Sequence, residues 1–366
     1  MASRVICARI LPVCAMTDQP PYRDFSPQID PVKGKTVLIT GGTGSFGRKM
    51  TETLLAHYDP KKIIILSRDE LKQYEQRCEL EERFPADKLS KMRFFLGDVR
   101  DRARLELAFR GVDIVIHAAA LKQVPAAEYN PSECIATNVN GAENVVWACL
   151  HNRVQRVVAL STDKACSPIN LYGATKLASD KIFVAANNLS GDIGTRFCVV
   201  RYGNVVGSRG SVVPYFKRLL TQGAKDLPIT DTRMTRFWIS LDQGVAFVLS
   251  CMELTQGGEI FVPKIPATLV TDLATAMAPK AGHTVIGIRP GEKLHEMMIS
   301  ADDARSTYEL DDRYVIEPEF VEYTRKSFAK VRGSKRVPEG FHYSSDINPE
   351  RLDASGIRGM MKAYLE

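Results

Sequence analysis

The chain has 366 residues, enough for one large domain or for a core with a smaller cap. Hydrophobic residues make up 45% and charged residues 25%, which are ordinary values for a globular protein, and no apolar run approaches the ~20 residues that span a membrane. The net charge of +6 suits an anionic ligand such as a nucleotide, but it is too mild and too diffuse to favour nucleic acid. We therefore expect neither a membrane nor a nucleic-acid partner.

The eight cysteines are scattered through apolar segments, and none forms a Cys-x-x-Cys pair. This spacing argues against a zinc site, so we expect no bound metal. Reduced, mostly buried thiols are typical of a cytoplasmic protein, which is the location we expect.

Residues 1–33 differ in composition from the rest of the chain. The segment begins with the short, basic and apolar stretch "MASRVICARILPVCAM" and continues with the Pro-rich polar stretch "TDQPPYRDFSPQIDP". We expect residues 1–33 to be a disordered extension. A weak targeting segment and a true start at Met16 are the alternatives.

The first predicted strand, Lys35–Gly42, leads into "TGGTGSFG" and a predicted helix, Phe46–His57. Gly41, Gly44 and Gly47 stand three apart at this junction. Glycines let backbone N–H groups approach a pyrophosphate, and the helix N-terminus adds partial positive charge. A plain tight turn gives the same letters, but the position between a strand and a helix favours a dinucleotide site.

The second predicted strand, Lys61–Glu70, ends in Ser67 and Arg68 where NAD enzymes usually place an acid. Arg68 can pair with a 2′-phosphate and Ser67 can donate to it, which favours NADP. Asp69 could still serve NAD, and Arg68 could simply be a solvated residue.

Further strands and helices follow in alternation. The third strand, Met92–Val99, ends in Asp98 and Val99, which suit an adenine edge, and the fourth ends in small residues that let a ribose lie against it. The remaining predicted elements are the helices Glu70–Arg83, Arg102–Phe109, Glu133–His151 and Tyr172–Asn188 and the strands Val112–Ala120, Val154–Thr162, Phe197–Val205 and Gly257–Lys264. Strands alternating with helices predict a Rossmann-type, doubly wound parallel sheet.

We place this nucleotide-binding domain at residues 34–206, with some later segments returning to it. The regular alternation fades after about Gly207. We expect residues 207–366 to form a smaller α/β substrate-binding region and a tail.

The stretch "STDKACSPINLYGATK" follows the fifth strand. Thr162, Tyr172 and Lys176 have the spacing of the Ser/Thr–Tyr–Lys set of nicotinamide-dependent oxidoreductases. A phenol with a pKa near 10 is a poor base, but a neighbouring ammonium and a cofactor's positive charge lower that pKa. Tyr172 could then take a proton from a hydroxyl as hydride leaves the carbon, while Lys176 holds the ribose.

Asp163 and Lys164 have no task in a simple dehydrogenase. Once a sugar carbon is oxidised to a ketone, a base can remove the neighbouring proton and an acid can expel the next hydroxyl as water. Lys164 is the candidate base, which requires a depressed pKa, and Asp163 is the candidate acid. The alternative is an ordinary salt bridge between the two.

Six motifs together resemble the configuration-inverting UDP-N-acetylglucosamine 4,6-dehydratases, a family of extended short-chain dehydrogenases/reductases that begin pseudaminic acid synthesis. They are "TGGTGSFG", "SRDELKQ", "HAAALKQVPAAEYNP", "STDKACSPINLYGATK", "RYGNVVGSRGSVVPYF" and "RPGEKLHE". The likeness covers about Lys35 to Thr307 and continues more loosely in "VPEGFHYSSDIN".

The resemblance implies a homo-oligomer in which tightly bound NADP is regenerated in each cycle. The residues expected at the cofactor are Gly41, Thr43, Gly44, Ser45, Phe46, Gly47, Ser67, Arg68, Asp69, Glu70, Leu71, Lys72, Asp98, Val99, Ala118, Ala119, Ala120, Lys122, Tyr172, Lys176, Val205, Val206, Gly207, Ser208 and Arg209. Those expected at the substrate are Lys122, Asn204, Val212, Thr230, Arg236, Arg289 and Glu292.

Three alternatives stay open. A UDP-sugar 4-epimerase would use the same cofactor and Tyr172 and leave Asp163 and Lys164 idle. A C5-retaining nucleotide-sugar 4,6-dehydratase would share the chemistry but keep the configuration. A non-catalytic relative would carry a damaged set of catalytic residues, and here the set is complete.

Overall fold

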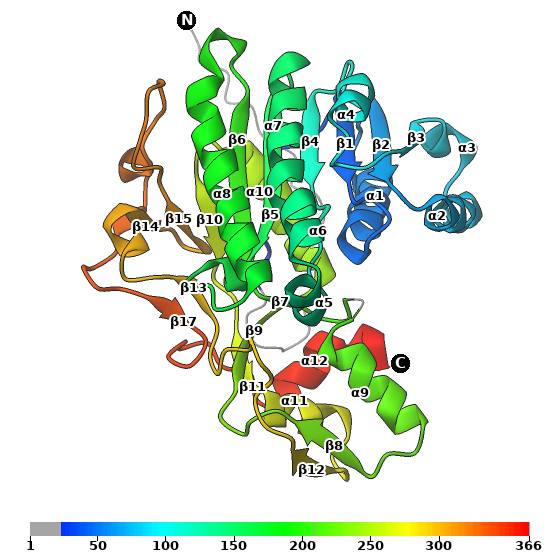
Figure 1. Ribbon diagram of the computed structural model, residues 1–366, viewed down its shortest axis with the longest axis vertical. Coiled ribbons are helices and arrows are strands. Elements are labelled where there is room, and N and C mark those ends of the chain that lie inside the picture. Colours follow the sequence, from blue (N-terminus) through cyan, green and yellow to red (C-terminus); the bar gives the residue numbers. More distant parts are fainter. Residues whose placement is uncertain (1–22, 209, 366) are drawn as a thin grey trace, which may run out of the picture.

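A ten-stranded sheet forms the centre of the computed structural model, which describes residues 23–208 and 210–365 (Figure 1). The strand order is β16-β14-β15-β10-β6-β5-β4-β1-β2-β3. The strands are β1 (Thr36–Thr40), β2 (Lys62–Ser67), β3 (Met92–Leu96), β4 (Ile114–His117), β5 (Arg156–Thr162), β6 (Arg196–Tyr202), β10 (Ile260–Pro263), β14 (Thr307–Glu309), β15 (Arg313–Ile316) and β16 (Lys335–Arg336). From β3 to β10 neighbouring strands run parallel, whereas β15, β14 and β16 add an antiparallel edge.

Helices cover both faces of this sheet, as expected when parallel strands are joined by crossovers. The helices of this part are α1 (Ser45–His57), α2 (Glu70–Arg83), α3 (Ala86–Leu89), α4 (Arg102–Ala108), α5 (Val124–Tyr129), α6 (Pro131–Ile135), α7 (Gly141–His151), α8 (Leu171–Leu189) and α10 (Leu241–Leu254). Helices α4, α7 and α8 lie beside one another, and α1 packs on α10 behind the sheet (Figure 1). The Rossmann-type α/β fold predicted from the sequence is confirmed.

Two helical details differ from the prediction. The helix predicted over Glu133–His151 is interrupted by a π-helical turn, Ala136–Asn140, between α6 and α7. Helix α5 was not predicted, and its six residues, starting with Val124 and Pro125, precede the turn into α6. Pro is favoured at the first turn of a helix, which explains why α5 and α6 can carry Pro125 and Pro131 in their first turns.

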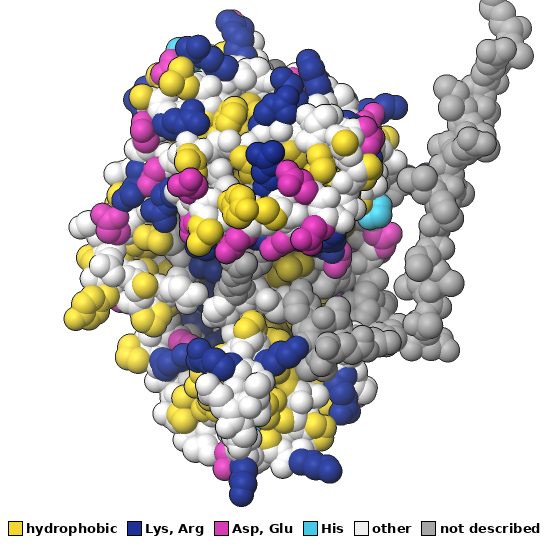
Figure 2. Space-filling model, turned by 90° about the vertical axis from the view of Figure 1, so that its right-hand side faces the viewer, with side chains coloured by type: hydrophobic (Ala, Val, Ile, Leu, Met, Phe, Trp, Pro, Cys, Tyr) yellow, Lys and Arg dark blue, Asp and Glu magenta, His cyan; other side chains and the backbone are white. Residues whose placement is uncertain are grey.

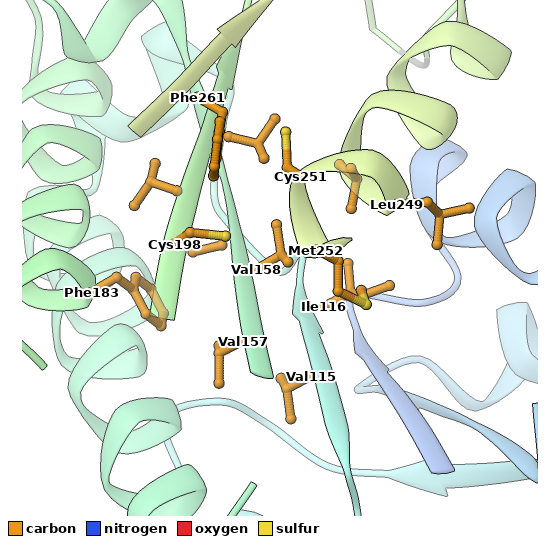
Figure 3. Packing of buried hydrophobic residues seen from close by; sticks show 14 of the residues in the cluster. Val115, Ile116, Val157, Val158, Phe183, Cys198, Leu249, Cys251, Met252 and Phe261 are labelled. Carbon is orange, nitrogen blue, oxygen red and sulfur yellow. The ribbon is translucent and has the colours of Figure 1, made fainter. Parts of the chain in front are cut away.

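Both faces of the central strands are buried in one hydrophobic core. Figure 3 shows Val157 and Val158 of β5 and Cys198 of β6 between Phe183 of α8 on one side and Met252 of α10 on the other. Side chains of a strand alternate between the two faces of the sheet, and here both faces are buried. The sequence of β5 is therefore a continuous apolar run rather than an alternation of apolar and polar residues. The six cysteines of the described residues all carry free thiols.

A smaller part lies beyond the carboxyl ends of the parallel strands (Figure 1). It contains the helices α9 (Val212–Thr221), α11 (Val270–Met277) and α12 (Ala354–Leu365), and the strands β7 (Asn204–Val205), β8 (Asp226–Ile229), β9 (Thr235–Ile239), β11 (Ala267–Leu269) and β12 (Gly282–Val285). Strands β13 (Met297–Ile299) and β17 (Tyr343–Ser344) form an antiparallel pair, and β13 contacts the 3₁₀ turn Asp163–Ala165 that follows β5. The chain passes between the two parts several times, because α10, β10 and β14 to β16 follow residue 207 yet belong to the large sheet or its helical layer. A domain boundary at residues 206 and 207 stays a prediction.

The segment after residue 22 is packed against the core. Phe25 is 1% exposed and meets the ring of Phe247 edge-on at 5.0 Å. Arg23 pairs with Glu350 at 2.6 Å, and Val32 is fully buried. The predicted disorder is therefore wrong for residues 23–33, because two apolar side chains find partners that the local sequence does not reveal. The rest of that prediction, residues 1–22, lies outside the described residues.

Within the described part of the chain, no helix is both long enough and apolar enough to cross a membrane.

Candidate active site

A cavity of about 940 Å³ lies where the large sheet meets the smaller part. Its wall includes residues after β1, β2, β3, β4, β5 and β6, together with residues of α9 and of the segment 289–296. Parallel α/β sheets bind ligands at the carboxyl ends of their strands. Figure 2 shows the molecule hollowed between the two parts, with Lys and Arg prominent among the charged side chains of the smaller part. The setting suits a long anionic ligand.

The glycine loop after β1 fits a dinucleotide. Gly41 has a φ of +65°, and a Cβ there would lie 2.9 Å from the backbone of Ala119. A Cβ on Gly47 would lie 2.5 Å from Gly42, so the loop and the first turn of α1 can only pack this closely without side chains. No described side chain caps α1 at Gly44, and the first turn of α1 contains no acidic residue. Its backbone N–H groups therefore suit a pyrophosphate.

The end of β2 carries the residues from which a preference between NAD and NADP was predicted. One oxygen of Asp69 accepts from the backbone N–H of Lys72 at 3.0 Å, and the other pairs with the Lys72 ammonium at 2.6 Å. The Lys72 side chain holds the pKa of Asp69 below its usual range. Arg68, which lies 3.5 Å from Asp98, lines the same part of the cavity as Lys72. Arg68 and Lys72 thus place two cations on this part of the wall, and both oxygens of Asp69 are already bound by Lys72.

Lys164 lies between two buried carboxylates. It belongs to the 3₁₀ turn Asp163–Ala165 that follows β5. The Lys164 Nζ is 3.1 Å from Asp163 Oδ1 and 3.1 Å from Glu296 Oε1. Burial alone would lower the pKa of Lys164, but the negative charges of Asp163 and Glu296 outweigh it and raise the pKa. The depressed pKa predicted for Lys164 is therefore wrong, because the charges of Asp163 and Glu296 together outweigh the effect of burial.

Asp163 is fully buried and sits behind Lys164. Its Oδ1 accepts from the Thr162 hydroxyl at 2.9 Å as well as from Lys164, and its Oδ2 has no hydrogen-bond partner among the described residues. Asp163 is not part of the cavity wall, whereas Thr162, Lys164 and Tyr172 are. The salt bridge considered as the alternative reading is thus formed, next to the predicted catalytic residues.

Tyr172 and Lys176 lie on the first turns of α8, whose N-terminus is capped by Asn170. Both side chains are buried and both line the cavity. Burial raises the pKa of Tyr172 to about 12, although the Lys164 cation and a hydrogen bond to Thr162 lower it. Burial also lowers the pKa of Lys176. Among the described residues burial outweighs the lowering effect of Lys164, and the predicted lowering of the tyrosine pKa by an ammonium together with a bound cofactor stays a prediction.

Most of the predicted cofactor positions lie on the cavity wall. They are Gly41, Thr43, Gly44, Ser45, Phe46, Gly47, Ser67, Arg68, Asp69, Lys72, Asp98, Val99, Ala118, Ala119, Ala120, Lys122, Tyr172, Lys176, Val205 and Ser208. Glu70, Leu71, Val206 and Gly207 are not on it. Leu71 is 65% exposed on α2, and Val206 is buried in the core of the smaller part. These two residues therefore lie away from the cavity, although their neighbours in sequence line it. Arg209 lies outside the described residues.

All seven predicted substrate positions line the cavity, namely Lys122, Asn204, Val212, Thr230, Arg236, Arg289 and Glu292. Arg289 and Glu292, both expected at the substrate, form an ion pair with each other at 2.7 Å. Arg236 is buried, and its guanidinium donates to the backbone carbonyls of Thr235, Leu294 and Lys293. These bonds occupy donors of the guanidinium that was predicted to bind substrate.

Glu296 is the main site residue that sequence reasoning missed. It is 2% exposed, lines the cavity and is the last residue of "RPGEKLHE", a motif from which only Arg289 and Glu292 were given roles. The motif "RPGEKLHE" contacts the motif "STDKACSPINLYGATK", because the Asn170 side-chain amide of the latter donates to the carbonyl of Gly291 in the former at 2.8 Å. Only the three-dimensional contact with Lys164 singles Glu296 out.

The parallel sheet, the glycine loop and the Thr–Tyr–Lys set at one cavity place the protein among the extended short-chain dehydrogenases/reductases. Residues 37–318 match the family described as polysaccharide biosynthesis protein, and the chain belongs to that family. The family resemblance predicted from the motifs is confirmed.

Similar proteins include two kinds of named enzyme. A UDP-N-acetylglucosamine 4,6-dehydratase (inverting) of Campylobacter jejuni is 60% identical over 321 residues, 87% of this chain and 94% of that protein. A UDP-glucose 4-epimerase of Rickettsia akari is 41% identical over 336 residues, 89% of this chain and 95% of that protein. The X-ray structure of Pen from Bacillus thuringiensis is 33% identical, with a TM-score of 0.81, and the match covers 92% of this chain and 99% of that one.

Proposed function

We propose that this protein is a UDP-N-acetylglucosamine 4,6-dehydratase that inverts C5, with NADP as its cofactor. The observation that carries the proposal is the placement of Lys164 on the wall of a cavity that also contains Tyr172 and the glycine loop. The likeness to the Campylobacter dehydratase over most of both chains supports the same reaction. The product would be a UDP-linked 4-keto-6-deoxy sugar of L-arabino configuration, the first intermediate of a pseudaminic acid-type pathway.

The reaction begins with oxidation at C4. A bound nicotinamide dinucleotide would accept hydride from C4 and return it to C6, so it is regenerated in each turnover. Tyr172 takes the O4 proton, for which its pKa must fall from about 12. Positive charge beside the phenol lowers a tyrosine pKa, and both Lys176 and the oxidised cofactor would supply it.

Water is then lost across C5 and C6. The C4 ketone acidifies the C5 proton, and Lys164 removes that proton as the base. A carboxyl beside Lys164, Asp163 in the prediction from sequence, protonates the departing C6 oxygen. Return of hydride to C6 and reprotonation of C5 from the other face give the inverted configuration.

Two features support NADP over NAD. Arg68 and Lys72 flank the expected position of the ribose 2′-group, and both oxygens of Asp69 are already bound by Lys72. A homo-oligomeric state and a cytoplasmic location stay predictions.

The deciding experiment is incubation with UDP-N-acetylglucosamine in deuterated water, followed by NMR. We expect a 4-keto sugar with a methyl group at C6, deuterium at C5 and inverted C5 configuration. A product that keeps oxygen on C6 and differs only at C4 would identify a 4-epimerase, the second candidate, which the Rickettsia relative favours. Retention at C5 would instead identify a retaining dehydratase.

A further inference from the structure

The backbone around Glu296 is fixed by a segment close to the C-terminus. The Glu296 N–H donates to the Ser345 hydroxyl at 2.9 Å, and the Glu296 carbonyl accepts from the Ser345 N–H at 2.8 Å. The Ser345 hydroxyl is also 2.7 Å from that of Thr235, on β9. These two hydrogen bonds to Ser345 hold the Glu296 carboxylate against Lys164 in a nearly solvent-free position.

Lys164 cannot act as a base while it is an ammonium. Since its Nζ lies 3.1 Å from each of two carboxylates, either Asp163 or Glu296 is close enough to take the extra proton. The two differ in their surroundings. Asp163 Oδ1 already accepts hydrogen bonds from both Thr162 and Lys164, and Asp163 does not reach the cavity wall.

Glu296 is better placed to carry a proton. Its Oε1 pairs with Lys164, its Oε2 has no hydrogen-bond partner in the described part of the chain, and the residue lines the cavity. A protonated carboxyl is a donor that needs an acceptor, and a sugar hydroxyl in the cavity would supply one. A sugar that displaces water also favours the neutral amine and carboxyl over the buried ion pair.

We propose that Glu296 takes the proton of the Lys164 ammonium when substrate binds and later gives it to the departing C6 oxygen. In the first step an N–H bond of Lys164 breaks and an O–H bond forms on Glu296. In the second, the free amine removes the C5 proton, the C5–H electron pair forms the C5–C6 double bond, and the C6 hydroxyl leaves as water with the Glu296 proton. Both residues end in their starting states. The inference rests on the proposed function and makes Asp163 a positioning residue for Lys164.

Besides Asp163, the described residues bring Arg236 and Tyr172 close to this pair. Arg236 Nε lies 3.8 Å from Glu296 Oε1, and Tyr172 is near enough to Lys164 for the lysine charge to lower the pKa of the phenol. The neighbours of Glu296 in sequence bind elsewhere: Lys293 donates to the Cys166 carbonyl at 2.6 Å, and His295 is 2.8 Å from the Thr235 hydroxyl.

The test compares the wild-type protein, Glu296→Gln and Asp163→Asn, each loaded with NADP+, over a range from about pH 6 to about pH 9. Glu292→Gln is the matched control, because Glu292 is a second cavity-lining glutamate of the same motif but pairs with Arg289 instead of Lys164. The readouts are the rate of C6 deoxygenation by NMR, KM, and reduced nicotinamide absorbance in a single turnover.

We expect Glu296→Gln to slow dehydration by about 10²–10⁴-fold, the usual contribution of general acid–base catalysis. Reduced nicotinamide should accumulate, because oxidation at C4 continues while elimination stalls. The residual rate should rise about tenfold per pH unit, since hydroxide must now remove the Lys164 proton. Asp163→Asn should slow the reaction without changing the wild-type pH dependence, and Glu292→Gln should raise KM alone.

Three outcomes would overturn the inference. One is a Glu296→Gln rate equal to or faster than wild type, which would mean that Glu296 only holds the ammonium. Another is a slower variant with the wild-type pH profile and no accumulation of reduced nicotinamide, which would mean a structural role. The third is a changed pH dependence in Asp163→Asn alone. If the wild-type protein itself leaves C6 oxygenated, the proposed function fails instead.

Discussion

Lys164 illustrates what a residue pattern can and cannot predict. The adjacent Asp163 and Lys164 were predicted from the sequence to be a proton-transfer pair, and the structure places them in contact. The raised pKa of Lys164 was only partly predictable, because the charge of Asp163 is visible in the sequence, whereas Glu296 reaches Lys164 from a distant part of the chain. Side-chain identity can be read locally, whereas a pKa depends on every charge that the fold brings near.

Arg68 should determine the preference for NADP. Replacing it, as Arg68→Ala, removes a cation from the cavity wall, so we expect NADP+ affinity to fall at least about tenfold, as for a lost charged hydrogen bond, with NAD+ affinity nearly unchanged. Fluorescence titration with both dinucleotides measures the ratio. Arg77→Ala, an exposed arginine on α2 paired with Glu81, is the control. Equal losses for both dinucleotides would show that Arg68 does not read the 2′-phosphate.

His117 should make stability pH-dependent. Burial, with a smaller effect of the Lys176 charge, lowers the pKa of His117 to about 3, and its Nδ1 is 2.8 Å from the Thr40 hydroxyl. The unfolded chain binds a proton near pH 6.5 and the folded chain does not, so stability is full above that pH and falls by about 1.4 kcal/mol per unit below it. Urea unfolding of wild type and His117→Gln between about pH 5 and pH 7 tests this. We expect a shallower slope for the variant; parallel slopes would contradict it.

The junction of β1 and α1 was predicted well because its constraints are local. Three glycines, a strand before them and a helix after them are all visible within one short stretch. The π-helical turn between α6 and α7 was not predicted, because the apolar periodicity of Glu133–His151 continues through it. Asn138 inside this turn binds both backbone groups of Leu121 at 2.8 Å, a long-range contact that local pattern does not record.

Two glycine substitutions should separate folding from binding at this junction. A Cβ at Gly47 would meet Gly42 Cα at 2.5 Å, so Gly47→Ala should lower the free energy of unfolding by about 1–3 kcal/mol, as for overpacking. A Cβ at Gly44 would meet only the Gly41 carbonyl, at 3.2 Å, so Gly44→Ala should fold but bind dinucleotide more weakly. Denaturant unfolding and dinucleotide titration are the measurements. A fully stable Gly47→Ala variant would contradict the packing argument.

At the scale of the whole molecule, the order of elements was predictable but their assembly was only partly so. The six alternating strands follow from apolar runs. A further strand was predicted over Gly257–Lys264, but its place in the large sheet, as β10, was not predicted. The antiparallel edge of β15, β14 and β16 and the packing of residues 23–33 were missed. Short strands in a charged tail and two apolar residues in a Pro-rich stretch carry too little local signal, since their partners lie far away in sequence.

The packed N-terminal segment should contribute to global stability. Phe25→Ala removes a ring that is buried against Phe247, so we expect the free energy of unfolding to fall by about 3–5 kcal/mol. Ile29→Ala, a 64% exposed apolar residue of the same segment, should change it by less than about 0.5 kcal/mol. Urea denaturation of both variants gives the comparison. Equal stability of Phe25→Ala and wild type would restore the original expectation of disorder.

The bond between Ser345 and the Glu296 backbone has a consequence for biosynthesis. The carboxylate that pairs with Lys164 is anchored only once Ser345 has left the exit tunnel of the ribosome. A polypeptide that ends before Ser345 lacks both hydrogen bonds that position the backbone of Glu296, so the surroundings of Lys164 are completed only in the last stretch of translation.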